Sequence, residues 1–277
     1  MKKFILFLGL MTSSSISHAW TVTADFEDGS IGEIATGSDG LTNNAAQATY
    51  TNEHVFLGGQ ALKAKVNSGG TAFGGMIQYP SSLGEGDEVW YRARWFFPSS
   101  WIFTTTSGQK LMRIGSKLNG GDWWDIYIDK DTHQIEPHTD LGASKVAFND
   151  YKYGDSPMIT GPRGQHGKAV KIDSWNTYEI YIKFSSVPSN SIIRIWQEGS
   201  LVFEAAGVVA TLASSNNVSD RVLIGNYYNG NAPKTMSAYI DNIEITSDRP
   251  SNSDANGNPM ISERTLTPRP PVQLSVQ

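Results

Sequence analysis

Apolar and polar side chains alternate along segment 86–101, and this pattern constrains the fold more than any other feature of the chain. The segment reads GDEVWYRARWFFPSSW, and the alternation places five large or apolar side chains on one face: Val89, Tyr91, Ala93, Trp95 and Phe97. Because successive side chains of a β-strand point to opposite faces, a long strand is predicted here.

Comparable segments follow one another at short intervals and are separated by turn residues. They are predicted at 21–29, 60–70, 74–80, 109–118, 123–131, 177–186, 191–205, 221–230 and 237–245. Many short strands of this kind, rich in aromatic residues, are typical of an all-β protein whose two sheets pack as a sandwich or jelly roll.

The first 19 residues are typical of a secretory signal peptide. Two lysines precede the apolar run 4–11, and Ser17-His18-Ala19 is a cleavage site of the small-x-small type. The run is too short to span a membrane. We therefore expect a protein secreted to the periplasm or the extracellular space, without membrane insertion, with one β-domain at 20–247. Residues 248–277, rich in Pro, Ser and Asn, are predicted to form a flexible tail.

The charge balance argues against nucleic acid as a partner. Loss of Lys2 and Lys3 with the signal peptide would change the formal charge from -5 to -7, because 20 of the 22 basic residues then remain against 27 acidic ones. The chain has no cysteine, so neither disulfides nor thiolate metal sites can stabilise it. We expect it to act as a monomer.

Several predicted strands carry aromatic and charged side chains on the face opposite their core residues. A solvent-exposed face usually carries Thr, Ser, Lys and Glu, so this set favours the surface of one groove: Trp90, Arg92, Arg94, Tyr127, Tyr181 and Tyr227. The alternative is that loops cover this face and that the aromatic residues form a second, smaller core.

Segment 175–199 resembles the concanavalin-like lectin/glucanase superfamily of curved jelly rolls. Trp175 precedes a strand, and a strand–Gly–strand hairpin follows with Arg194, Trp196 and Gly199. The resemblance covers most of 24–245 and implies a two-sheet β-jelly-roll sandwich. The glycosidases of this superfamily carry E-x-D-x-(x)-E on one strand, which this sequence lacks. Asp125 and Asp129 share a strand face but lie about 13 Å apart, whereas a retaining mechanism needs about 5–5.5 Å.

Segments 86–101, 108–115 and 226–245 resemble the jelly-roll polysaccharide lyases that act on alginate, glucuronan or heparin-type chains. One alginate-lyase group has a late strand of the form aromatic-x-Lys-x-Gly-x-Tyr-x-Gln. Gly225 and Tyr227 match its glycine and tyrosine, whereas Leu223 and Asn229 stand in place of its lysine and glutamine.

Such a lyase removes the proton beside a uronate carboxylate and expels the 4-oxygen. Cations or amides must neutralise the carboxylate, and a Tyr or His transfers the proton. The resemblance therefore implies a catalytic set of Tyr227, His138, Arg94, Arg113 and Lys110. It implies a substrate-binding set of Trp90, Arg92, Tyr127, Tyr181, Tyr228 and Asn226. The expected partner is an acidic polysaccharide, and catalysis is expected to require no cofactor.

A non-catalytic carbohydrate-binding protein or lectin is the alternative function. In that case Asp25, Glu27 and Asp241 would hold a structural calcium ion that joins the first and last strands. A weaker third option is a surface matrix protein that uses the tail as a tether.

Overall fold

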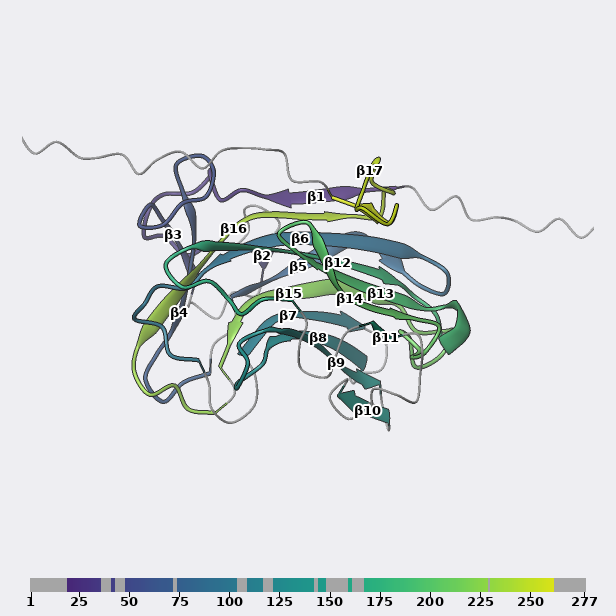
Figure 1. Ribbon diagram of the computed structural model, residues 1–277. Helices are drawn as coiled ribbons and strands as arrows, with labels where there is room; N and C mark the ends of the chain where they lie inside the picture. Colours follow the sequence, from purple (N-terminus) through teal and green to yellow (C-terminus); the bar gives the residue numbers. More distant parts are fainter. Residues whose placement is uncertain are drawn as a thin grey trace, which may run out of the picture.

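Two antiparallel β-sheets pack face to face and enclose the main core (Figure 1). The computed structural model describes residues 19–35, 41–42, 48–71, 74–103, 109–116, 122–141, 144–147, 159–160, 167–228 and 230–261. The predicted signal peptide, apart from Ala19, therefore lies outside the described residues.

Sheet A has the strand order β11-β14-β13-β12-β6-β16-β4-β3, and β1 also pairs with β16. Its strands are β1 (Thr21–Ala24), β3 (Ala48–Thr51), β4 (Ala61–Val66), β6 (Glu88–Phe96), β11 (Ile159–Thr160), β12 (Trp175–Lys183), β13 (Ile192–Gln197), β14 (Ser200–Ala206) and β16 (Met236–Thr246).

Sheet B has the strand order β10-β9-β8-β7-β15-β5-β2. Its strands are β2 (Leu41–Thr42), β5 (Gly75–Leu83), β7 (Gln109–Ser116), β8 (Asp122–Ile128), β9 (Ile135–Leu141), β10 (Ser144–Ala147) and β15 (Ser219–Tyr227). The described residues contain one helix, the three-residue 3₁₀ turn η1 (Pro188–Asn190), and none long and apolar enough to cross a membrane.

The alternation read from the sequence explains the core. Tyr91 and Trp95 of β6 point between the sheets and are fully buried, and Trp124 of β8 is buried on the opposite sheet. The main core therefore combines the inward faces of both sheets, and the prediction of an all-β, two-sheet sandwich is confirmed.

A second, smaller core lies on the outer face of sheet A. It contains Trp90, Tyr181, Trp196, Met260 and Ile261, and the last two come from the end of the hairpin β17 (Asn252–Ser253) and β18 (Pro259–Met260). The indole N–H groups of Trp90 and Trp196 donate to the Pro259 carbonyl at 3.0 Å and to Asp254 Oδ2 at 2.8 Å.

The expectation of a flexible tail from residue 248 is thus wrong as far as Ile261, because this segment seals the aromatic side chains of sheet A. The prediction followed the polar composition of the segment, but the segment ends in two apolar residues, Met260 and Ile261. Asp254 shapes the turn between β17 and β18 by accepting the N–H groups of Asn256 and Asn258 at 2.8 and 2.9 Å. Residues 262–277 lie outside the described residues.

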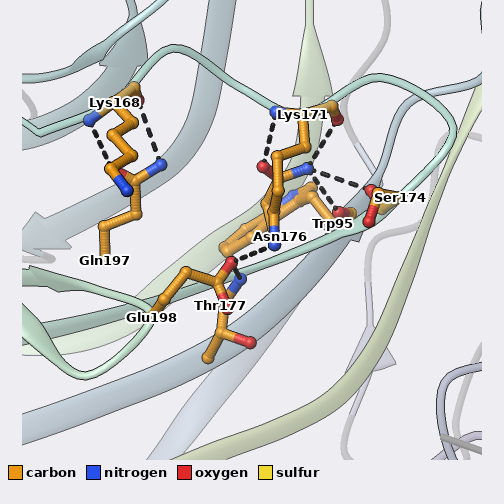
Figure 2. Close-up of polar contacts among 8 residues, drawn as sticks. All are labelled: Trp95, Lys168, Lys171, Ser174, Asn176, Thr177, Gln197 and Glu198. Atoms are coloured by element: carbon orange, nitrogen blue, oxygen red, sulfur yellow. Dashed lines mark hydrogen bonds and ion pairs between the residues drawn. The ribbon is translucent and has the colours of Figure 1, made fainter.

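Asn176 fixes the segment that leads into β12 (Figure 2). Its fully buried amide accepts the Lys171 N–H at 2.8 Å and donates to the carbonyl oxygens of Lys171, Ser174 and Trp95 at 2.9, 3.1 and 3.3 Å. One side chain thereby forms hydrogen bonds with four backbone groups.

We expect Asn176→Ala to lower the free energy of unfolding by about 2–4 kcal/mol, because it leaves several buried backbone groups without partners. Urea denaturation followed by tryptophan fluorescence measures this loss. Asn52→Ala changes an exposed asparagine and is expected to cost less than about 0.5 kcal/mol. Equal stability of the two variants would contradict the structural role of Asn176.

Candidate active site

A group of cationic, acidic and aromatic side chains lies on the outer face of sheet B, where β8, β7 and β15 are neighbours. We call it the sheet B cluster, and its members are Lys110, Arg113, Trp123, Asp125, Tyr127 and Tyr227. The intervening residues Ile114, Trp124 and Ile126 are buried in the main core. Because side chains alternate along each strand, the members of the cluster point away from that core.

Tyr227 and Lys110 face each other across β15 and β7, and Lys110 is also paired with Tyr127 of β8. The Lys110 ammonium lies 4.9 Å from the ring centre of Tyr227 and 5.3 Å from that of Tyr127. The strand register shifts beside this pair, between Ile224 and Tyr227 on β15 and between Lys110 and Met112 on β7. Such bulges redirect side chains and are frequent next to active sites.

Asp125 lies at the centre of the cluster. Its carboxylate accepts two hydrogen bonds from Arg113, Nε to Oδ1 at 2.6 Å and Nη2 to Oδ2 at 2.7 Å. Oδ2 also lies 3.2 Å from the Lys110 Nζ and accepts the Tyr127 hydroxyl at 3.4 Å. The Arg113 guanidinium stacks over the Trp123 ring at 4.3 Å. Burial alone would lower the pKa of Arg113, but the hydrogen bonds and charge of Asp125 raise it above its ordinary value.

The structure thus brings four predicted residues together: Tyr227, Lys110, Arg113 and Tyr127. His138 of β9 is the register partner of Asp125 on the next strand, and Asn226 precedes Tyr227 on β15. The side chains of His138 and Asn226 lie outside the described part of the chain.

Arg94 does not belong to this site, so its expected role beside Tyr227 is wrong. It lies on β6 of sheet A and points to the outer face of that sheet, so the main core separates it from the sheet B cluster. Its Nη1 donates to Asn242 Oδ1 at 3.0 Å, and its guanidinium lies 4.2 Å from the Phe56 ring centre.

The expected single groove surface is likewise split between the two sheets. Trp90 and Tyr181 belong to the small core of sheet A. For these two residues the structure matches the alternative in which the aromatic residues form a second, smaller core. Arg92 of the same face forms an ion pair with Glu244 at 2.7 Å. Tyr228 packs into the main core, and burial raises the pKa of its phenol. These four residues therefore cannot bind a substrate that lies on the sheet B cluster.

Arg92 and Arg94 line a cavity of about 580 Å³ on the outer face of sheet A. Its lining carries both signs of charge, with the cations Arg92, Arg94 and Arg249 and the carboxylates Asp25, Glu244 and Asp248. Among the described residues that line it there is no tyrosine, whereas Lys110 of the sheet B cluster lies beside the Tyr227 ring.

The three carboxylates expected to hold calcium serve backbone groups instead. Asp241 accepts the N–H groups of Phe56 and Leu57, and Glu27 accepts those of Gly59 and Gln60, all at 2.8–3.1 Å. Asp25 accepts the Glu27 N–H at 3.3 Å. Burial raises the pKa of Asp241 to about 7, although its N–H donors and Arg94 act against this shift. Among the described residues, no three acidic or histidine side chains converge as a metal site, so the expected set is not formed.

Sequence reasoning missed Asp125 and Trp123 as members of the site. Their strand was recognised, but the contact with Arg113 depends on how β8 pairs with β7. The alternation of side chains along the strand predicts that Asp125 points away from the core, but it does not predict that Arg113 is its partner.

No family model and no curated protein sequence matches the chain. Solved structures do. The endo-β-1,4-glucuronan lyase of the fungus Trichoderma reesei is 15% identical, with a TM-score of 0.55, and covers 80% of this chain and 93% of its own. The alginate lyase Aly36B is 14% identical, with a TM-score of 0.55, over 81% and 96% of the two chains. The cellulose-induced protein Cip1 is 14% identical, with a TM-score of 0.52, over 84% and 100%.

The chain has the jelly-roll fold of polysaccharide lyases. At this identity the likeness concerns the fold alone, and the predicted jelly roll is thereby confirmed. In this jelly-roll sandwich the sheet B cluster holds the tyrosine and the cations that the predicted chemistry requires.

Proposed function

We propose that the protein is a secreted polysaccharide lyase that cleaves a uronate-containing polysaccharide by β-elimination at the sheet B cluster. The observation that carries this proposal is the pair of Tyr227 and Lys110 facing each other across β15 and β7, with Arg113 nearby. The relative Aly36B was solved with an alginate tetrasaccharide as a variant in which a lysine and a tyrosine are replaced by alanine. In this chain Lys110 and Tyr227 are a lysine and a tyrosine that lie together. Secretion would follow from the signal peptide at residues 1–19.

The elimination breaks two bonds and forms one double bond in the sugar ring. Tyr227, as phenolate, takes the proton from C5, and the electrons of the C5–H bond spread onto the uronate carboxylate. These electrons then form the C4=C5 double bond as the C4–O4 bond breaks. The departing oxygen receives a proton from the Tyr227 phenol. Lys110 and Arg113 stabilise the negative charge that spreads onto the uronate carboxylate before O4 leaves.

One tyrosine that both removes and returns the proton must act from one side of the sugar ring. The substrate then needs C5–H and C4–O4 on the same side, as in β-D-glucuronate and β-D-mannuronate. In α-L-guluronate and α-D-galacturonate they lie on opposite sides. We therefore expect turnover of glucuronan or polymannuronate to exceed that of polyguluronate and polygalacturonate by at least about tenfold, because Tyr227 cannot reach both sides.

The test incubates the purified protein with each of the four polymers and follows the absorbance of the new double bond at about 232 nm. Reducing-end analysis of the products confirms cleavage. Turnover of none of a broad panel of uronate polymers would refute the lyase. Faster turnover of polyguluronate or polygalacturonate would refute the role of a single tyrosine on one side of the ring.

A non-catalytic carbohydrate-binding protein is the second candidate. Cip1 shares the fold, and its name states no lyase activity. Trp123 and Tyr127 also offer ring faces for sugars whether or not a bond is broken. Retention on an immobilised glycan without any product would favour this function.

A further inference from the structure

A carboxylate at the centre of a site for an anionic polymer requires an explanation. Asp125 would repel a uronate carboxylate that approaches Lys110 and Arg113. Its side chain is only 9% exposed, so it is not an incidental surface charge. A second carboxylate, Glu136 of β9, is the register partner of Tyr127 and is also buried.

The contacts of Asp125 indicate what it does. It holds Arg113 by both carboxylate oxygens, and the same Oδ2 that binds Arg113 also approaches Lys110 and the Tyr127 hydroxyl. Lysine and arginine side chains have many rotamers, and a two-point contact with a carboxylate selects one of them. The cations are only 11% and 22% exposed, so their remaining freedom is small.

We infer that Asp125 is a positioning residue, which fixes Lys110 at the Tyr227 ring and fixes Arg113 over the Trp123 ring. This inference rests on the proposed function. Asp125 does not touch the reacting atoms. It acts through the two cations, and it lowers the positive charge that the site offers to a polyanion by one. Asp125 thereby weakens the binding of the substrate in the ground state, but it fixes the geometry of the two cations.

The test is Asp125→Asn, which keeps the size of the side chain and removes its charge. An amide can accept only one of the two Arg113 hydrogen bonds, so we expect kcat to fall about 10- to 100-fold. KM for the polymer should not rise, and its dependence on salt should steepen, because the site gains one positive charge. A loss of folded protein would lower kcat without changing the salt dependence of KM.

Two further variants complete the experiment. If Asp125 acts through Arg113, the double variant Asp125→Asn/Arg113→Met should be no slower than the slower single variant, because the effects are not additive. Glu204→Gln is the matched control, since it removes a carboxylate from the Arg194–Glu204 ion pair of sheet A. It should leave kcat within about twofold.

The outcomes separate this inference from the proposed function. An active wild type with an equally active Asp125→Asn variant overturns the inference and leaves the lyase standing. A slow variant with an unchanged salt dependence, or with effects that simply add to those of Arg113→Met, also overturns it. A wild type that cleaves no uronate polymer overturns both.

Discussion

Tyr227→Phe is expected to lower kcat by about 100- to 10,000-fold, because it removes the hydroxyl that takes the proton from C5 and returns it to O4. The ring remains, so the variant should still be retained by the polymer. Tyr227 lies on the outer face of sheet B, away from the main core, so the free energy of unfolding should change by less than about 0.5 kcal/mol. Initial rates at 232 nm and affinity electrophoresis in polymer-containing gels measure the two properties separately.

Tyr127→Phe is the matched control for this variant. Tyr127 lies on the other side of Lys110 in the same cluster, and its hydroxyl donates to Asp125 at 3.4 Å. Its loss is expected to slow the reaction less than about tenfold, because only a weak hydrogen bond disappears. More than a tenth of wild-type activity in Tyr227→Phe would contradict the assignment. So would a large loss in Tyr127→Phe alone, which would transfer the role to Tyr127.

The sequence was sufficient to predict the fold, because apolar and polar side chains alternate clearly along the strands. The residues assigned to the inward face of β6, including Tyr91 and Trp95, are fully buried as expected. The segment at 252–261 could not be predicted in the same way. Its polar composition is typical of a tail. Met260 and Ile261 pack on the outer face of sheet A against Trp90 and Trp196, and this surface exists only once the strands of the sheet have paired.

The alternation predicts which face of its own strand carries a residue, but not which sheet that strand joins. Arg94 and Arg113 look equivalent in the sequence, since each lies on the polar face of an alternating strand. Their difference arises from pairing between distant segments: β6 pairs with β12 and β16, whereas β7 pairs with β8 and β15. No local pattern contains that information.

The neighbours Tyr227 and Tyr228 illustrate a second limit. Tyr227 was expected to be catalytic and Tyr228 to bind the substrate in the same site, but adjacent residues of a strand point to opposite faces. The register shift between Ile224 and Tyr227 decides that Tyr227 points out, while Tyr228 packs into the main core. A bulge has no reliable sequence signal, although Gly225, with a φ of 154°, lies within it.

Lys110→Met is expected to lower kcat by about 100- to 1,000-fold, because it removes the positive charge nearest to Tyr227 without removing the aliphatic chain. The Lys110 side chain is only 11% exposed, so water screens its charge less than that of a surface lysine. In the proposed reaction its charge stabilises the carboxylate-centred negative charge of the intermediate, and Asp125 holds Arg113 over the Trp123 ring. Steady-state kinetics on the polymer that the wild type cleaves fastest provide the measurement.

Lys110→Arg and Lys63→Met separate the charge of Lys110 from other effects of the substitution. Arginine keeps the charge with a different shape, so Lys110→Arg should retain more activity than Lys110→Met. Lys63 forms an ion pair with Glu53 on sheet A at 2.5 Å, and its replacement by Met should leave kcat within about twofold. If Lys110→Met were as active as Lys63→Met, the positive charge beside Tyr227 would have no part in the reaction, and the elimination would need another group to neutralise the uronate.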